Sequence, residues 1–235
     1  MVKSVMRHRD ATKHGIDISK SRLDDVDREV VRFALGYKGK KVAVDIGCGS
    51  GRVSIILALM GFDVWLYDIQ DLASYYKRVG EALDISNRLH FKQLDINVMT
   101  REDLPTDITL TIAQRTLHHV HYSNALSVLS TIYKKTIKGG KLYMSLSGID
   151  SKLAENYECI DSPVAERYCE VGEIGKEVYS ISGKVCLYTE SEVQELVEES
   201  KFTLNKLHKS DFGNIKVSCS KSSKEYSTYS QVNSR

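Results

Sequence analysis

VAVDIGCGSG, residues 42 to 51, is the stretch that decides the fold. Its first five residues are apolar apart from Asp45, and they predict a short buried strand. Glycines follow at every second position, Gly47, Gly49 and Gly51, and a helical pattern begins directly after them. Glycine lets the backbone turn sharply and approach a ligand more closely than a residue with a Cβ atom allows. A strand, a glycine turn and a helix in this order predict the opening of a nucleotide-binding βαβ unit.

The spacing of these glycines separates two kinds of ligand. Dinucleotide-binding folds carry G-x-G-x-x-G, whereas here an acid stands two residues before the first glycine, in the pattern D-x-G-x-G-x-G. A carboxylate at that place repels a phosphate and suits a ligand with a cationic amine. Residues 45 to 51 resemble the first motif of class I methyltransferases, which use S-adenosylmethionine. The resemblance implies that the cofactor is bound by Asp45, Gly47, Cys48, Gly49 and Gly51.

The next two predicted strands each end in an acid, Asp68 and Asp95. One carboxylate offers two acceptor oxygens to two vicinal hydroxyls, so Asp68, with its neighbour Ile69, is predicted to bind the ribose of the cofactor. A surface aspartate that merely ends a strand is the alternative. In the family that the first motif resembles, an acid after the third strand meets the adenine amino group and an apolar neighbour packs on the ring. The resemblance therefore implies these roles for Asp95 and Ile96.

The fourth predicted strand ends in Gln114-Arg115-Thr116-Leu117-His118-His119, where class I methyltransferases place their reactive residues. The segment lacks the Asn-Pro-Pro-Tyr or Asp-Pro-Pro-Tyr motif that grips the exocyclic amine of a base. It also lacks the Pro-Cys motif of pyrimidine carbon methylation. The Leu-His-His sequence is similar to the small-molecule branch of the family, including enzymes that resemble the tellurite-resistance methyltransferase.

Residues at this strand end are the candidates for catalysis. A histidine with a near-neutral pKa can take a proton from an attacking hydroxyl or amine, so His118 and His119, together with Arg115, are predicted to be catalytic. Since the two histidines are adjacent, at most one is expected to point into the site. The alternative is that they cap or brace the helix that follows. Gln114 is assigned to the cofactor.

The whole pattern predicts one α/β domain with the Rossmann-like class I methyltransferase fold. We expect a mostly parallel seven-stranded sheet with an antiparallel last strand. Strands are expected at residues 42–46, 62–67, 89–94, 108–113, 141–146, 202–207 and 215–219. Helices are expected at residues 21–35, with Ser21 as the cap, 52–60, 71–84, 123–138, which Gly139-Gly140 should end, and 189–199.

Residues 148–187 interrupt the alternation and are long enough to form a lid-like insertion over the end of the fourth strand. Tyr157, Arg167 and Tyr168 of this insertion are predicted to contact the substrate. Between Asp150 and Ser200 there are 13 acidic and four basic residues, which is a poor surface for a polyanion. We therefore expect a small-molecule substrate, methylated on oxygen, nitrogen or sulfur, in preference to a nucleic acid.

Composition sets the remaining expectations. The 235-residue chain is 42% hydrophobic and has a net charge of +2, which predicts a soluble cytoplasmic protein with no membrane span. Its five cysteines show no C-x-x-C pair, so we expect reduced thiols, no disulfide and no metal site. Residues 1–20 are expected to form a basic arm, residues 21–220 the domain, and residues 221–235 a disordered tail. Two further functions stay open: an RNA or protein methyltransferase, which the basic arm would serve, or a module that binds the cofactor without turnover.

Overall fold

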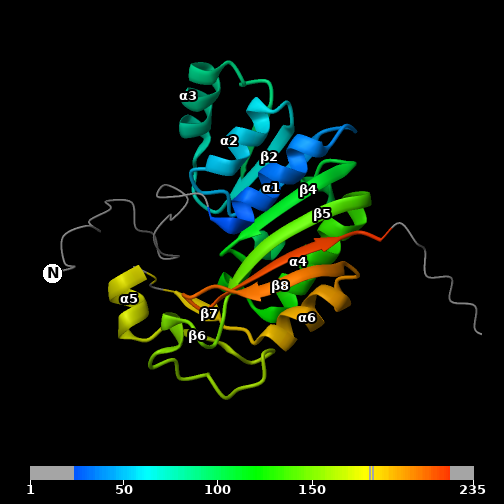
Figure 1. Ribbon diagram of the computed structural model, residues 1–235. Coiled ribbons are helices and arrows are strands. Elements are labelled where there is room, and N and C mark those ends of the chain that lie inside the picture. The colour runs from blue at the N-terminus through cyan, green and yellow to red at the C-terminus, as the bar shows by residue number, and fades with distance from the viewer. Residues whose placement is uncertain (1–23, 180, 182, 223–235) are drawn as a thin grey trace, which may run out of the picture.

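A seven-stranded sheet forms the centre of the computed structural model, which describes residues 24–179, 181 and 183–222 (Figure 1). The strand order is β3-β2-β1-β4-β5-β9-β8. The bounds are β1 Val42–Ile46, β2 Asp63–Asp68, β3 Leu89–Gln93, β4 Ile108–Gln114, β5 Thr136–Ser147, β8 Thr203–Lys209 and β9 Asn214–Ser220. Strands β1 to β5 run parallel, and β9 lies antiparallel between β5 and β8. The predicted sheet is confirmed, including its antiparallel last strand.

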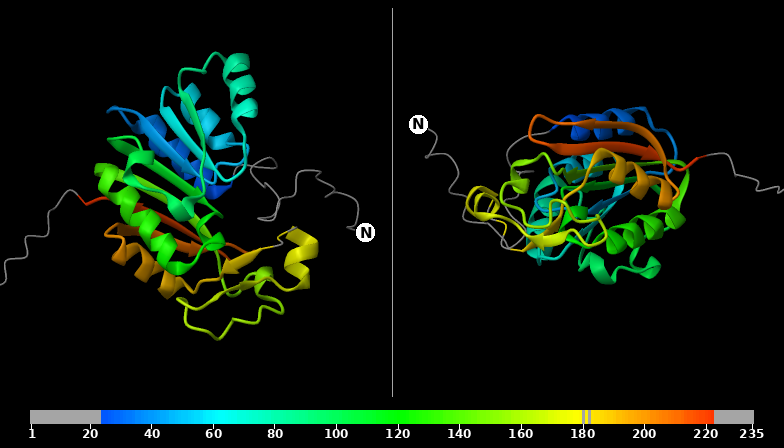
Figure 2. Two further views of the ribbon diagram at one scale, coloured as in Figure 1. Left: turned by 180° about the vertical axis from the view of Figure 1, so that it is seen from behind. Right: turned by 90° about the horizontal axis from the view of Figure 1, so that it is seen from below.

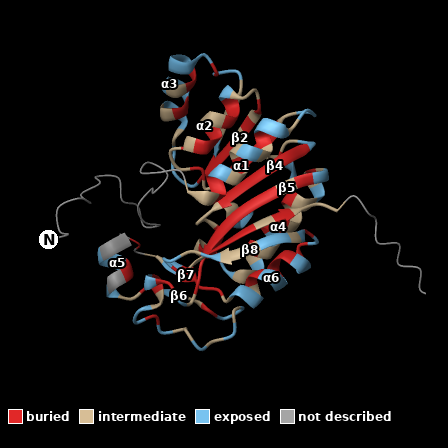
Figure 3. Cartoon of the chain, viewed as in Figure 1, coloured by how far each residue is buried: buried red, intermediate tan, exposed pale blue. Residues whose placement is uncertain are grey.

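Helices cover both faces of the sheet. One face carries α1 Asp25–Gly36, α2 Arg52–Leu59 and α3 Ala73–Leu83, whose buried residues form one apolar cluster with β1, β2 and β4. Figure 2 shows α4 Tyr122–Lys135 and α6 Glu190–Glu199 on the opposite face, where a second cluster forms. Two 3-10 turns, η2 Ile96–Val98 and η3 Arg101–Asp103, lie between β3 and β4, and a third, η4 Leu117–His119, joins β4 to α4. The central strands are buried over most of their length because both faces are covered (Figure 3).

Two predicted helix ends are wrong. Helix α1 begins at Asp25, not at residue 21, because Asp24 is its N-cap and forms a capping box with Asp27. Helix α4 ends at Lys135, where the Thr136 hydroxyl donates to a carbonyl of its last turn. Gly139-Gly140 lies inside β5 instead, in a bulge that separates the pairing of residue 136 from that of residue 141. By contrast, the predicted cap of α6, Thr189, is confirmed.

The segment between β5 and α6 forms a small unit beside the carboxyl ends of the parallel strands (Figure 1). It contains η5 Lys152–Ala154, β6 Tyr168–Glu170, α5 Glu173–Tyr179 and β7 Lys184–Cys186, and β6 pairs with β7. It has its own apolar cluster of Leu153, Tyr157, Val171, Ile181, Val185 and Leu187. The lid role remains a prediction. The predicted basic arm at residues 1–20, the predicted helix cap Ser21 and residues 223–235 of the predicted tail lie outside the described residues.

Cys159 and Cys169 form a disulfide inside this insertion, with their Cα atoms 6.2 Å apart. The expectation of five reduced cysteines is therefore wrong for this pair, whereas Cys48, Cys186 and Cys219 are free and buried. The folded insertion brings together two cysteines whose spacing in the sequence matches no redox or metal motif. Since disulfides are rare in the cytosol, cysteine usage no longer favours a cytoplasmic location, which stays a prediction. Within the described ranges, no helix is long and apolar enough to cross a membrane.

Candidate functional site

The glycine turn after β1 adopts the left-handed backbone that its sequence predicts. Gly47, Gly49 and Gly51 have φ angles of 69°, 50° and 60°. A Cβ atom at Gly47 would collide with the side chain of Thr116, and one at Gly51 would collide with the ring of Tyr76. Each of these two glycines is needed because another element packs directly on the turn.

Two tyrosines of α3 donate hydrogen bonds to the main chain of this turn. The Tyr76 hydroxyl donates to the Gly49 carbonyl at 2.8 Å, and the Tyr75 hydroxyl donates to the Ser50 carbonyl at 3.0 Å. Tyr76 is buried and its ring stacks on Phe91, with the ring centroids 5.3 Å apart. The sequence shows only a tyrosine pair in a predicted helix, so this contact with the turn was not predicted.

Asp68 lies at the mouth of the turn, where the sequence predicts it. Its Oδ2 accepts the Gly49 amide at 2.9 Å, and its Oδ1 accepts the Gln70 amide at 3.0 Å. A carboxylate has about four acceptor positions, so each oxygen retains one for a hydroxyl. The neighbouring Ile69 is 37% exposed and offers an apolar surface beside them. These residues fit a ribose with its attached base.

The other two predicted cofactor residues of the first motif are buried. Asp45 accepts the Ser54 hydroxyl at 2.6 Å and so holds α2 to β1. Burial, and the charge of Asp45, raise the pKa of the Cys48 thiol, so it stays protonated and inert. Cys48 therefore has only its main chain to offer a cofactor.

After β3, Asp95 and Ile96 also have partners of their own. Asp95 caps η2, because its carboxylate accepts hydrogen bonds from the backbone amide and from Nδ2 of Asn97, both at 2.9 Å. Ile96 is partly buried against the apolar cluster under α4. Their predicted contacts with adenine remain predictions.

The end of β4 is tied to both neighbouring elements. The side-chain nitrogen of Gln114 donates to the Asp27 carboxylate of α1. Arg115 has a φ of 52°, and its amide donates to the Ser145 carbonyl of β5 at 2.8 Å. The Thr116 hydroxyl lies 2.9 Å from the Ile46 carbonyl at the end of β1. No sequence motif indicates Asp27 or Thr116, because their contacts depend on which elements the fold brings together.

Turn η4 carries the predicted catalytic histidines, and their environments differ. His118 is only 3% exposed, whereas His119 is half-buried, and their ring centroids are 4.2 Å apart. Tyr168 of the insertion donates its hydroxyl to the His119 carbonyl at 2.8 Å, and its ring centroid lies 4.1 Å from that of His121. The insertion is therefore attached to the histidine turn through Tyr168.

The other two predicted substrate residues lie in the interior of the insertion. The Tyr157 hydroxyl contacts the carbonyls of Arg167 and Val185 at 3.0 and 2.7 Å. Arg167 is buried, donates to the carbonyls of Ser162 and Leu187, and pairs with Glu192 at 2.7 Å. These contacts give both side chains a structural role, and their contact with a substrate stays a prediction.

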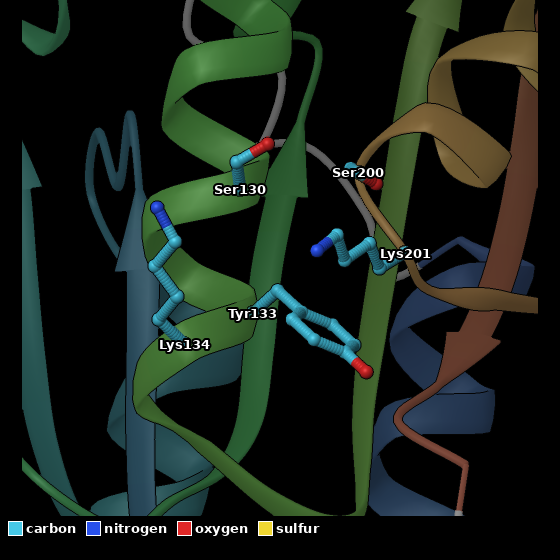
Figure 4. Close-up of a pocket in the computed structure, with 5 residues that line it drawn as sticks. All are labelled: Ser130, Tyr133, Lys134, Ser200 and Lys201. Carbon is cyan, nitrogen blue, oxygen red and sulfur yellow. The ribbon is translucent and has the colours of Figure 1, made fainter. Parts of the chain in front are cut away.

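A pocket of about 180 Å³ lies elsewhere, between the last turns of α4 and α6. It is lined by Ser130, Tyr133, Lys134, Ser200 and Lys201 (Figure 4). Both helices end at the edge of the sheet where the parallel strands begin, which is opposite the glycine turn. The pocket therefore lies away from the candidate site.

The strand order, the glycine turn and the acid at the end of β2 together give the fold of a class I methyltransferase. A family model described as "Methyltransferase domain" matches residues 38–201, which is more than half of the chain. The protein belongs to this family, and the predicted enzyme class is confirmed. S-adenosylmethionine, the predicted cofactor, is the methyl donor of this class. A comparison with curated protein sequences finds no match.

Solved structures agree on the fold. Magnesium protoporphyrin IX methyltransferase from Synechocystis PCC 6803, solved with bound S-adenosylhomocysteine, has a TM-score of 0.57 at 16% identity, covering 83% of this chain and 82% of that one. 1,6-Didemethyltoxoflavin-N1-methyltransferase from Burkholderia thailandensis has a TM-score of 0.59 at 17% identity, and the match covers 88% of this chain and 81% of that one. An S-adenosylmethionine-dependent methyltransferase from Methanosarcina mazei has a TM-score of 0.58 at 18% identity, and the match covers 81% of this chain and 97% of that one. At these identities the likeness concerns the fold alone.

Proposed function

We propose that the protein transfers a methyl group from S-adenosylmethionine to an oxygen, nitrogen or sulfur nucleophile of a small molecule. The observation that carries the proposal is that three parts of the chain meet at one edge of the sheet. The glycine turn with Asp68 offers a donor site, η4 offers the histidines, and the acidic insertion joins η4 through Tyr168. Two similar folds whose names give a porphyrin and a toxoflavin precursor as substrates agree with a small-molecule acceptor.

The donor, when bound, supplies a methyl group already activated by its sulfonium. The chain then has to hold the donor, align the acceptor with it and exclude water. Asp68 would accept the ribose hydroxyls, and Asp95 and Ile96 would meet the adenine. The backbone of Asp45, Gly47, Cys48, Gly49 and Gly51 would approach the methionine part of the donor, together with Gln114.

His119 is the better placed of the two histidines to meet an acceptor, because it is the more exposed. There it would take the proton of a hydroxyl or amine as the new bond forms. His118 would brace η4 from inside. Arg115 stays the third predicted catalytic residue. The tellurite-resistance-like branch remains a prediction, since nothing in the site singles out its acceptor.

The test is production of S-adenosylhomocysteine with a panel of small phenols, amines and thiols, with bulk RNA as the rival acceptor. We expect turnover with members of the small-molecule panel. His119→Ala should lower kcat at least tenfold with unchanged donor affinity, whereas His118→Ala should mainly lower the melting temperature. Methylation of RNA with a steep salt dependence would replace the small-molecule assignment. Donor binding without product from any acceptor would reduce the protein to a binding module.

A further inference from the structure

Asp27 is a buried acid with a contact beyond its role in the capping box of α1. It lies in the first turn of α1, only 8% of its surface is exposed, and it faces the end of β4. One carboxylate oxygen accepts the Asp24 amide at 2.9 Å, and the other accepts the side-chain nitrogen of Gln114. A burial of this kind costs free energy unless the charge has partners, so the contact with Gln114 calls for an explanation.

Gln114 stands directly beside the glycine turn. The register that pairs Asp45 with Ile112 brings Gln114 level with Gly47 on the neighbouring strand. Residues 110, 112 and 114 alternate onto the face that α1 covers, and Leu110 and Ile112 belong to the cluster under that helix. Gln114 therefore connects Asp27 to the strand end beside the glycine turn.

An ionised carboxylate only accepts hydrogen bonds, so it decides which end of a carboxamide faces it. With its nitrogen against Asp27, Gln114 must turn its carbonyl oxygen to another direction. We propose that Asp27 is a positioning residue for methyl transfer, which orients Gln114 so that its carbonyl oxygen serves as an acceptor for the cationic amine of the donor. This inference rests on the proposed function.

The start of α1 is anchored well enough to impose such an orientation. Lys216 of β9 pairs with Asp24 at 3.1 Å and also with Asp25. His208 of β8 lies 2.6 Å from the Asp25 carboxylate. Two strands at the far side of the sheet therefore fix the helix turn that carries Asp27.

Protonation of Asp27 would reverse the orientation. Burial raises the pKa of Asp27, as does the Asp24 charge, while the Asp24 amide, Gln114 and the Arg115 charge oppose this. A protonated Asp27 can donate its O–H to the Gln114 oxygen, which lets the carboxamide turn its nitrogen toward the cationic amine. Donor affinity should then fall as the solution is acidified.

The first test is calorimetric titration of S-adenosylmethionine into wild type and Asp27→Asn between pH 5 and pH 8, with circular dichroism to confirm folding. The introduced carboxamide keeps its oxygen on the Asp24 amide and therefore presents its nitrogen to Gln114, which turns the Gln114 nitrogen toward the donor. We expect about tenfold weaker binding at pH 8 and loss of the acid-side decline. Parallel pH profiles with equal affinities would overturn the inference and leave the proposed function standing. A wild type that does not bind the donor would overturn both.

Two further variants separate positioning from structure. Thr189→Ala breaks the capping box of α6 and should lower the melting temperature while changing donor affinity less than twofold. Asp27→Asn combined with Gln114→Glu reverses the polarity of the pair, because the new carboxamide on α1 then donates to the new carboxylate on β4. This double variant should restore affinity to within about threefold of wild type. Equal losses of affinity in Thr189→Ala and Asp27→Asn, or no rescue in the folded double variant, would rule out positioning. The double variant also decides the matter where Asp27→Asn alone does not fold.

Discussion

At the scale of single residues, Asp68 joins the scaffold to the chemistry. Its carboxylate accepts the Gly49 amide and so fixes the turn, and its remaining acceptor positions are those that we propose for the ribose of the donor. Asp68→Ala should weaken donor binding by about 2 kcal/mol, because a buried hydroxyl pair loses its charged partner. The measurement is calorimetric titration of S-adenosylmethionine.

Asp63→Ala is the matched control, since Asp63 starts the same strand at the opposite edge and forms a half-exposed pair with Arg88. It should leave donor affinity unchanged. A loss of less than twofold in Asp68→Ala would show that Asp68 does not bind the ribose.

The sequence predicts the residues whose chemistry lies in a local motif, but not those that act across elements. Asp45, Asp68 and the glycines follow from spacing and from strand ends. Asp27 and Tyr76 act on the site from α1 and α3, and only tertiary packing brings them there. Arg167 shows the reverse: a lone arginine in an acidic insertion suggests a substrate contact, but its charge neutralises Glu192.

At the scale of elements, Arg167 and Glu192 connect the insertion to α6. Arg167→Leu should destabilise the protein by about 3 kcal/mol, because the Glu192 carboxylate, of which only 16% is exposed, would lose its cationic partner. Donor affinity should not change. Chemical denaturation measures the first effect and calorimetric titration the second. Lys176→Leu, which breaks the exposed pair with Glu173 in the same insertion, should cost less than about 1 kcal/mol.

The stabilising effect of this pair depends on pH in a defined direction. Burial raises the pKa of Glu192, but the Arg167 guanidinium and the Thr189 amide outweigh it and hold the pKa below the ordinary value of 4.5. Because the folded-state pKa is the lower one, the contribution is complete above about pH 4.5 and is lost as the pH falls through the folded-state pKa. If Arg167→Leu instead abolished turnover without destabilising the fold, the arginine would belong to the substrate site.

The disulfide between Cys159 and Cys169 cross-links the insertion. Cys169→Ser, or treatment with a dithiol, should remove about 2 to 4 kcal/mol of local stability by freeing the ten-residue span between the cysteines. The measurement is limited proteolysis, in which residues 150–187 should be cleaved faster than in the oxidised wild type. Cys186→Ser changes a free buried cysteine nearby and controls for the loss of a thiol. Equal cleavage rates with and without reductant would show that packing alone holds the segment.

The elements that alternate regularly were predictable, and the errors have local causes. A glycine pair after the basic end of a helix predicts that the helix stops there. The structure ends α4 earlier, at the β-branched Thr136, and places the two glycines in a bulge of β5. The insertion has no periodicity, so its two short strands and its disulfide could not be predicted. Its fold depends on contacts among Leu153, Tyr157 and Val185.

At the scale of the whole molecule, the donor should act as a stabilising ligand. S-adenosylmethionine at about 100 times its Kd should add roughly 2.7 kcal/mol, which corresponds to a rise of about 5 to 11 °C in Tm for a domain of this size. Thermal unfolding with and without the donor measures this. Adenosine triphosphate is the control, because Asp45 and Asp68 disfavour a triphosphate. A larger shift with the nucleotide would contradict the donor assignment.

The described chain enters and leaves the sheet at opposite edges. Asp24 begins α1 beside the end of β4, whereas Lys221 continues β9 where the parallel strands start and exchanges main-chain hydrogen bonds with Gly139 and Gly140. The Lys221 ammonium also donates hydrogen bonds to the carbonyls of Tyr133 and Thr136. Attachment of the protein to a sensor surface at Ser222 therefore leaves the proposed donor and acceptor edge facing the solution.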